Sequence, residues 1–208
     1  LKGVYADLGA LNEEWGTGFA DWEEVEPIHL EEAQSLGQLP RWADHRLHME
    51  KVFLDMHLFG SEVIREIDPL ARVGFDGAWY TSSWVGYDFW DLMNNLEFMG
   101  VYFPPEQLEQ MRSFKRPGTS IGTWYGGYVW GGFGAYGHFK YAPQREEDFQ
   151  RYWPWHLLLH GCDGAWWFHA FGLSECAIAP DMSIYPIFRH TIEEVNEIKS
   201  GVARLLLN

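Results

Sequence analysis

Apolar positions recur at helical spacing in several segments of the chain. The clearest is Arg41 to Ile67, where apolar residues repeat at steps of three and four and form one stripe. Asp68-Pro69 ends that predicted helix, because the residue before a proline disfavours the helical conformation. Further helices are predicted over residues 88–95, 105–114 and 144–160, and from Thr191, where Thr-Ile-Glu-Glu is a capping-box pattern.

Four short apolar runs lie between these helices and predict strands. They cover residues 71–76, 96–103, 120–125 and 163–169. Strands that alternate with helices form parallel sheets with helical crossovers, and a (β/α)₈ TIM-type barrel is their natural host. Four strand–helix units make half of such a barrel. We therefore predict that the α/β chain, residues 1–208, is the C-terminal half of one barrel domain. Residues 1–40 would be an acidic, irregular segment after the fourth strand, and residues 41–208 would contain strands five to eight with their helices.

The third predicted strand runs into an unusual stretch, Gly118 to Gly137. It contains eight glycines and six aromatic residues and no charge. Glycine lets a backbone lie close to a ligand, and aromatic faces stack on flat apolar surfaces such as the C–H faces of sugars. Two interpretations stay open: a loop whose aromatics fill a core, or the floor of a binding cleft.

Composition and charge exclude several classes of partner. The formal net charge is −15, from 30 acidic and 15 basic residues, which argues against nucleic acid and anionic membranes. No apolar run approaches the roughly 18 residues of a membrane span. The two cysteines neither require nor exclude a disulfide. The chain begins at Leu1 without a methionine, so we expect it to be a piece of a longer protein.

The sequence also lacks a recognisable cofactor or metal motif. There is no glycine-rich dinucleotide or phosphate-loop pattern. Three histidines lie on or near the long helix, but His45 and His48 have no third ligand at convincing spacing. We therefore expect no cofactor and no metal, and interpret these histidines as surface or packing residues.

Active sites of such barrels lie at the C-terminal ends of the strands. The residues there are mostly aromatic and predict binding of a neutral carbohydrate: Trp79, Tyr102, Trp124, Tyr125, Phe168 and His169. Asp76 is a candidate catalytic acid or base, or a turn former that bonds its own backbone. Glu175, in the loop after the last strand, is a second candidate or an exposed loop acid. Asp163 begins its strand, where a stability role is expected.

Two stretches resemble a known family. LNEEWGTGF followed by DWEEVEP resembles the segment after the fourth barrel strand of glycoside hydrolase family 42, the barrel-type β-galactosidases, and GCDGAWWFHAF resembles the family's eighth strand. The resemblance implies a retaining mechanism with one glutamate on the fourth strand and another on the seventh. The first would precede Leu1. It also implies a substrate-binding role for Phe19.

The sequence departs from the family where the nucleophile belongs. No acidic residue occurs from Gln110 to Tyr141, Ala20 replaces the tryptophan after Phe19, and His169 replaces an arginine. Galactose specificity is therefore not carried over. Two hypotheses follow: a divergent glycosidase whose nucleophilic role has moved to Asp76 or Glu175 or to an activated water, or a carbohydrate-binding barrel without catalysis. A half-barrel also exposes strand edges, so we expect poor solubility or a homo-oligomer.

Overall fold

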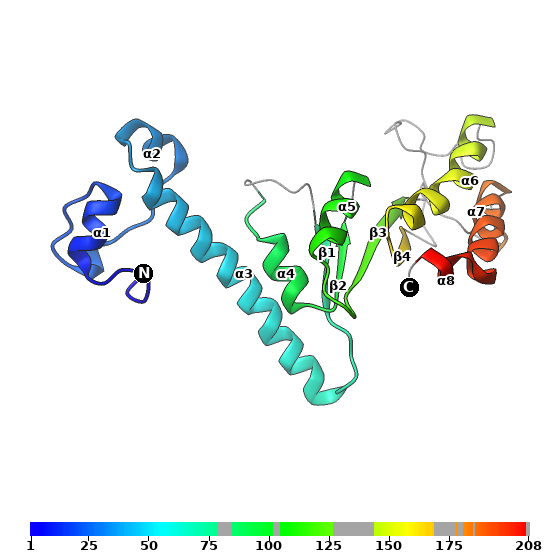
Figure 1. Ribbon diagram of the computed structural model, residues 1–208, viewed down its shortest axis with the longest axis horizontal. Helices are drawn as coiled ribbons and strands as arrows, with labels where there is room; N and C mark the ends of the chain where they lie inside the picture. Colours follow the sequence, from blue (N-terminus) through cyan, green and yellow to red (C-terminus); the bar gives the residue numbers. More distant parts are fainter. Residues whose placement is uncertain are drawn as a thin grey trace. The chain divides into compact units, whose positions relative to one another are not determined.

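The computed structural model describes residues 1–78, 85–101, 105–126, 144–168, 178, 181–184 and 186–206. The chain divides into two compact units, whose elements are labelled in Figure 1. The first unit consists of Leu1–Gly60 with Gly86–Asp88, and the second of Ser61–Val85 with Phe89–Asn208.

The first forty residues contain three helical elements joined by turns, which corrects the prediction of an irregular segment. They are α1 (Leu8–Trp15), the 3₁₀ turn η1 (Trp22–Glu24) and α2 (Leu30–Leu36). Caps explain α1: the Asp7 carboxylate accepts the Ala10 N–H at 2.8 Å, and Gly16 ends the helix at a φ of 65°. The acidic side chains of this region are exposed, as predicted.

The Trp15 side chain connects α1 to the long helix α3 (Leu39–Ile67) through a hydrogen bond. This side chain is only 2% exposed, and its indole N–H donates to Asp44 Oδ2 at 2.8 Å. Asn12 closes the following turn, because its Oδ1 accepts the Phe19 N–H at 2.9 Å while its Nδ2 donates to the Phe19 carbonyl at 2.9 Å. The motif LNEEWGTGF therefore consists of the C-terminal part of α1 and a turn that the Asn12 side chain stabilises.

The long helix α3 (Leu39–Ile67) confirms the clearest sequence prediction. Its apolar stripe is largely exposed, with Met56 at 58% and Phe59 at 68%. Ser61, on the other side of the helix, is buried. The periodicity therefore predicted the helix correctly, but the stripe is not its buried face.

The second unit contains a four-stranded sheet: β1 (Gly74–Ala78), β2 (Phe98–Val101), β3 (Ser120–Gly126) and β4 (Gly164–Phe168). The strands pair in sequence order and all run parallel. All four predicted strands are present, with bounds that differ by a few residues. The predicted alternation of strands and helices is also present, whereas the half-barrel remains a prediction.

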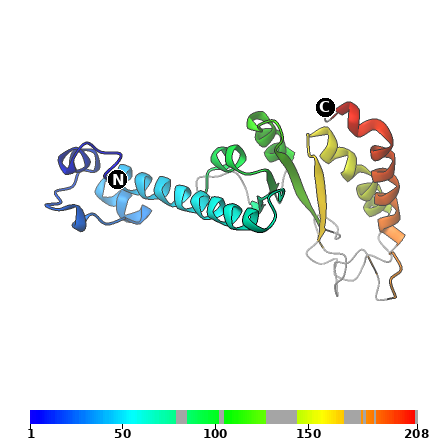
Figure 2. The ribbon, with the colours of Figure 1, turned by 90° about the horizontal axis from the view of Figure 1, so that it is seen from below.

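Two helices, α4 (Phe89–Asn95) and α5 (Pro105–Phe114), provide crossovers between the first three strands (Figures 1 and 2). Both were predicted at these places. Their buried Leu92, Met93, Leu108 and Met111 contribute to the core. The strands add Met99, Val101 and Ile121, each at most 1% exposed. Because side chains alternate along a strand, these three share one face of the sheet.

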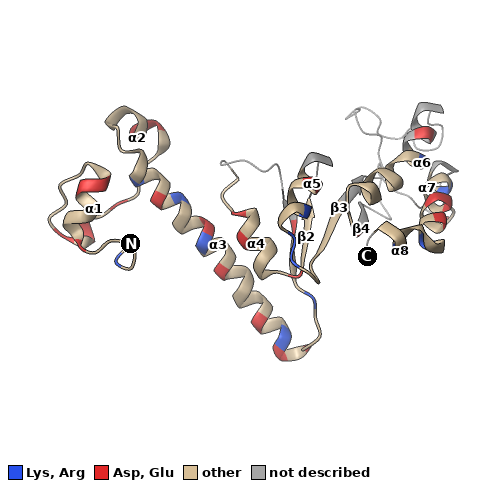
Figure 3. Ribbon diagram, viewed as in Figure 1, with Lys and Arg blue, Asp and Glu red and all other residues tan. Residues whose placement is uncertain are grey.

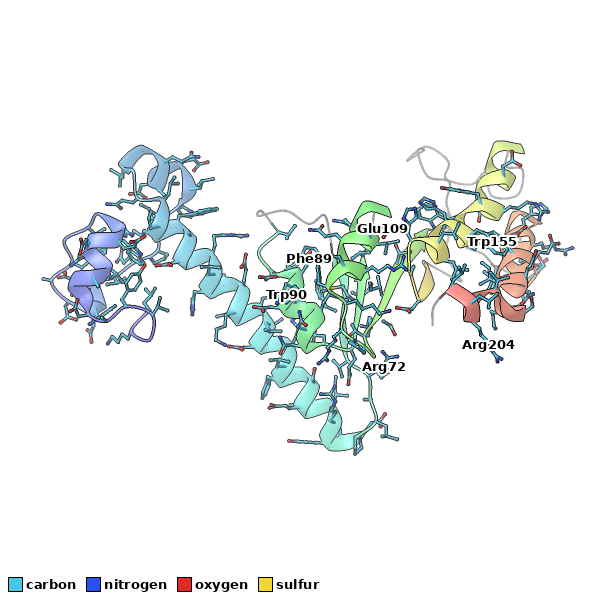
Figure 4. All side chains as sticks on the ribbon, in the orientation of Figure 1. Arg72, Phe89, Trp90, Glu109, Trp155 and Arg204 are labelled. Carbon is cyan, nitrogen blue, oxygen red and sulfur yellow. The ribbon has the colours of Figure 1, made fainter. Side chains whose placement is uncertain are left out.

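The C-terminal helices pack against one another. They are α6 (Gln144–Leu159), α7 (Pro186–Glu197), the π-helical turn η2 (Ile198–Val202) and α8 (Ala203–Leu206). The Trp155 indole donates to Glu194 Oε2 at 2.7 Å and joins α6 to α7 (Figure 4). The predicted capping box is wrong, since Thr191 lies inside α7 and donates to Gln150 Oε1 at 2.8 Å. Helix α6 also continues through Pro154.

Candidate functional site

The parallel pairing brings the C-terminal ends of the four strands to one edge of the sheet. Ala78 pairs with Val101, Val101 with Thr123, and Thr123 with Ala165, which defines a row across all four strands. Strands β3 and β4 continue three residues beyond this row. We refer to this side of the sheet as the C-terminal edge.

Aromatic residues occupy the extension of β3 and β4. Trp124 pairs in register with Trp166, Tyr125 with Trp167, and Gly126 with Phe168. The pairing makes a ladder in which five of six positions are aromatic. Trp124, Tyr125 and Phe168 were sequence candidates. Trp166 and Trp167 were not, because their partnership depends on a register that the sequence does not reveal.

Asp76 lies within β1, two residues before its end, rather than at the terminus that the sequence predicts. The register of β1 against β2 shifts between Phe75 and Ala78, so Asp76 and Gly77 together oppose one residue of β2, Gly100. This is a β-bulge, a feature that re-aims side chains and is frequent near active sites. Among the four strands, Asp76 is the one acidic residue.

The Asp76 carboxylate lies over the backbone of Gly100. A Cβ atom on Gly100 would stand 1.9 Å from Asp76 Oδ1 and 2.9 Å from its Cγ. Glycine at this position therefore makes room for the carboxylate. Gly100 pairs with Gly122, and Gly122 with Gly164, so a row of three glycines crosses the sheet beside Asp76.

The opposite, N-terminal edge of the sheet is closed by charged side chains. Arg72, labelled in Figure 4, donates from one Nη to the Glu97 carbonyl at 2.9 Å, the Gly118 carbonyl at 3.0 Å and Ser120 Oγ at 3.0 Å. The arginine thereby ties the start of β1 to the starts of β2 and β3. Its role is structural.

Glu97 completes this closure. Its carboxylate accepts the Val73 N–H at 2.7 Å and pairs with Arg65 at 2.7 Å. The hydrogen bond from Val73, and after it the Arg65 guanidinium, hold the pKa of Glu97 below its usual range. The folded state therefore favours ionised Glu97.

Asp163 has the stability role that its position predicts. Its Oδ2 accepts the Ile121 N–H at 2.7 Å and the Lys115 ammonium at 2.6 Å, and it joins the starts of β3 and β4. The neighbouring Cys162 is a free thiol that donates to the Gly164 carbonyl at 2.8 Å. Burial raises the pKa of Cys162 to about 12, so this thiol is unsuited to act as a thiolate nucleophile.

Several sequence candidates fall outside the described residues: Trp79, Tyr102, His169 and Glu175. They follow β1, β2 and β4 along the chain, and their roles remain predictions. For Trp124, Tyr125 and Phe168 the structure gives strand positions only.

Phe19 belongs to the first unit, in the turn after α1. The Trp15 ring contacts it edge-on at 6.4 Å, and the Arg41 guanidinium lies 5.2 Å from its ring centroid. These contacts give Phe19 a packing role within its unit. Its substrate-binding role stays a prediction.

Within the described ranges, no group of three or more His, Cys, Asp or Glu residues is arranged to hold a metal ion. None of the helices in the same ranges has the length and apolar character to cross a membrane. Comparison with protein-family models, with curated proteins and with solved structures gives no significant match.

Proposed function

We propose that this chain is part of a (β/α)₈ glycoside hydrolase domain that acts on O-glycosidic bonds of a neutral sugar. The observation that carries the proposal is the asymmetry of the sheet. Ion pairs close its N-terminal edge, whereas its C-terminal edge combines the aromatic ladder with the Asp76 carboxylate. In parallel α/β folds the first kind of edge supports stability and the second supports function.

Aromatic surface with few polar groups suits the binding of neutral sugars. The apolar C–H faces of a pyranose stack on indole and phenol rings, while the hydroxyls need only a small number of hydrogen-bond partners. The ladder of β3 and β4 supplies the aromatic positions. Trp79 and Tyr102, which come directly after β1 and β2 in the sequence, are proposed to extend that surface.

Asp76 is the proposed catalytic carboxylate on the sheet. A retaining glycosidase needs two carboxyl groups about 5–5.5 Å apart, one as nucleophile and one as acid and base. Asp76 stands on the bulge of β1, with the glycine of β2 leaving its carboxylate room. The nucleophilic role is proposed for Asp76 or for Glu175. The acid/base is proposed to lie on a fourth strand that precedes Leu1.

Steady-state hydrolysis of para-nitrophenyl glycosides by the protein that includes the preceding strands tests this assignment. Asp76→Asn or Glu175→Gln should lower kcat by about 10³-fold or more, the scale of losing a member of a catalytic pair. Asp91→Asn, at an exposed position of α4, is the matched control and should leave kcat unchanged. Unchanged kcat in both Asp76→Asn and Glu175→Gln would refute the relocated nucleophile.

A second candidate function is carbohydrate binding without hydrolysis. The observation that favours it is the composition of β3, Ser120–Gly126, which contains no acidic residue where the resemblance places a nucleophile. Calorimetric titration with oligosaccharides separates the two functions. Binding with no reducing sugar released over days would support the second candidate, and turnover would exclude it.

A further inference from the structure

The first unit contains a cavity that the proposed function does not use. Its volume is about 510 Å³, which is within the range of small-molecule sites. Four of its lining residues matter for the chemistry: Lys2, Trp22 on η1, Glu26 two residues after η1, and Asp44 on α3.

The Trp22 indole, on the wall of the cavity, makes a cation–π contact with Lys2. The Lys2 ammonium lies 5.9 Å from the ring centroid of Trp22. A cation over an aromatic face is attracted by the negative potential of the ring, and tryptophan gives the strongest attraction. The same arrangement recurs in this unit, where Arg41 lies 6.0 Å from the Trp15 ring. The cavity thus contains a position where a positive group is stable.

Two carboxylates on the wall retain unused acceptor capacity. Asp44 accepts the Tyr5 hydroxyl and the Trp15 indole with Oδ2 alone, which leaves Oδ1 available. In the described part of the chain, the Glu26 carboxylate takes part in no hydrogen bond or ion pair; only its backbone carbonyl is used, by Arg41 Nε at 2.8 Å. Both carboxylates can therefore balance an incoming positive charge.

The segment around the cavity carries a net negative charge, which favours a cationic ligand. Residues 1–40 contain nine acidic residues and one basic residue, Lys2 (Figure 3). A negative field of this kind raises the local concentration of cations and repels anions. It adds no attraction for a neutral sugar, so the charge distinguishes the ligand class of this cavity from that of the strand ends.

We propose that this cavity binds a small organic cation of the alkylammonium class. The cationic group takes the place of the Lys2 ammonium over Trp22, and Glu26 and Asp44 balance its charge. The proposal concerns the first unit only and is independent of glycoside hydrolysis, because none of its residues belongs to the sheet.

Titration of the full chain with choline, followed by calorimetry and tryptophan fluorescence, tests the proposal. The matched probe is 3,3-dimethylbutan-1-ol, which has the shape of choline without the charge. Choline should bind about tenfold more tightly than the alcohol, the scale of a partly desolvated cation–π contact, and salt should weaken its binding. Methyl β-galactoside is the neutral-sugar probe and should not compete with choline.

Variants identify the site. Trp22→Ala and Glu26→Gln should each weaken choline binding by about three- to tenfold. Lys2→Ala should strengthen it, because the competing ammonium is removed. Trp90→Ala, at an exposed tryptophan of the second unit, and Glu31→Gln, on α2, are controls that should leave it unchanged. Far-ultraviolet circular dichroism verifies that each variant is folded.

Equal binding of choline and the alcohol would overturn the proposal, as would absence of choline binding or undiminished binding in Trp22→Ala. Competition by methyl β-galactoside would also overturn it and would assign the cavity to sugar. Loss of glycoside hydrolysis in other variants has no bearing on these outcomes, so this inference and the proposed function fail separately.

Discussion

The Asp76 carboxylate occupies the space that a side chain on Gly100 would need. Because a Cβ on Gly100 would meet Asp76 Oδ1 at 1.9 Å, Gly100→Ala must displace the carboxylate. We expect it to reduce the free energy of unfolding by about 1–3 kcal/mol, as overpacking does. Urea denaturation of the variant measures this loss.

Two controls show whether the carboxylate causes that effect. Gly164→Ala lies in the same glycine row, but its Cβ would meet nothing within 4 Å, so it should be neutral or stabilising by about 0.5–1 kcal/mol. In an Asp76→Ala background the cost of Gly100→Ala should shrink. An equal cost in both backgrounds would show that Asp76 is not the group displaced.

Glu97 gives a prediction for pH. Its pKa is lowered in the folded state, so its ionisation stabilises the fold above the unfolded pKa of about 4.3, and this stability disappears as pH falls through the lower folded pKa. Glu97→Gln should therefore be less stable than the wild type at pH 7, and the difference should diminish at acidic pH. Chemical denaturation at several pH values measures it. A pH-independent difference would contradict the assignment.

In α3 the apolar residues that form the helical pattern are largely exposed. Phe59 is 68% exposed, so Phe59→Ser should change the free energy of unfolding by no more than about 0.5 kcal/mol. Leu92 on α4 is 1% exposed, so Leu92→Ala should cost about 2–5 kcal/mol. Denaturation of both variants is the measurement. A core-sized loss for Phe59→Ser would mean that the stripe is covered in solution.

The sequence predicted elements well where local signals are strong. The four strands are short apolar runs bounded by turn residues, and α4 and α5 begin and end near the predicted residues. The capped helices of residues 1–40 were missed because their many charges obscure the pattern. Thr191 was misassigned because helix α7 begins five residues earlier, at Pro186, and buries the threonine against α6.

The site was only partly predictable, for a physical reason. Residue identity at the strand ends is visible in the sequence, so Asp76, Trp124 and Tyr125 were candidates. Register is a property of two strands together, so the bulge opposite Gly100 and the pairing of Trp124 with Trp166 could not be read from one segment. The sequence predicted the stabilising role of Asp163 at the N-terminal edge. It did not predict the roles of Arg72 and Glu97, because their side chains hydrogen-bond backbone groups that are distant in sequence.

The outer strands of the sheet, β1 and β4, each have one strand partner among the described residues. Open strand edges pair with other chains, so we predict that this chain alone self-associates or precipitates as its concentration rises. Light scattering after size-exclusion chromatography measures the association. A monodisperse monomer that unfolds cooperatively would contradict the prediction. Dissociation by Phe59→Lys would assign the association to α3 instead.

We propose that the C-terminal edge of the sheet engages neutral glycosides and cleaves them. A proton NMR time course of a neutral oligosaccharide, incubated with the protein that includes the preceding strands, tests both steps, because one series of spectra reports binding and turnover. We expect the sugar signals to broaden and the anomeric signals of a new reducing end to follow, and we expect those new signals to be lost in Asp76→Asn or Glu175→Gln. Spectra that remain unbroadened and unchanged would contradict it.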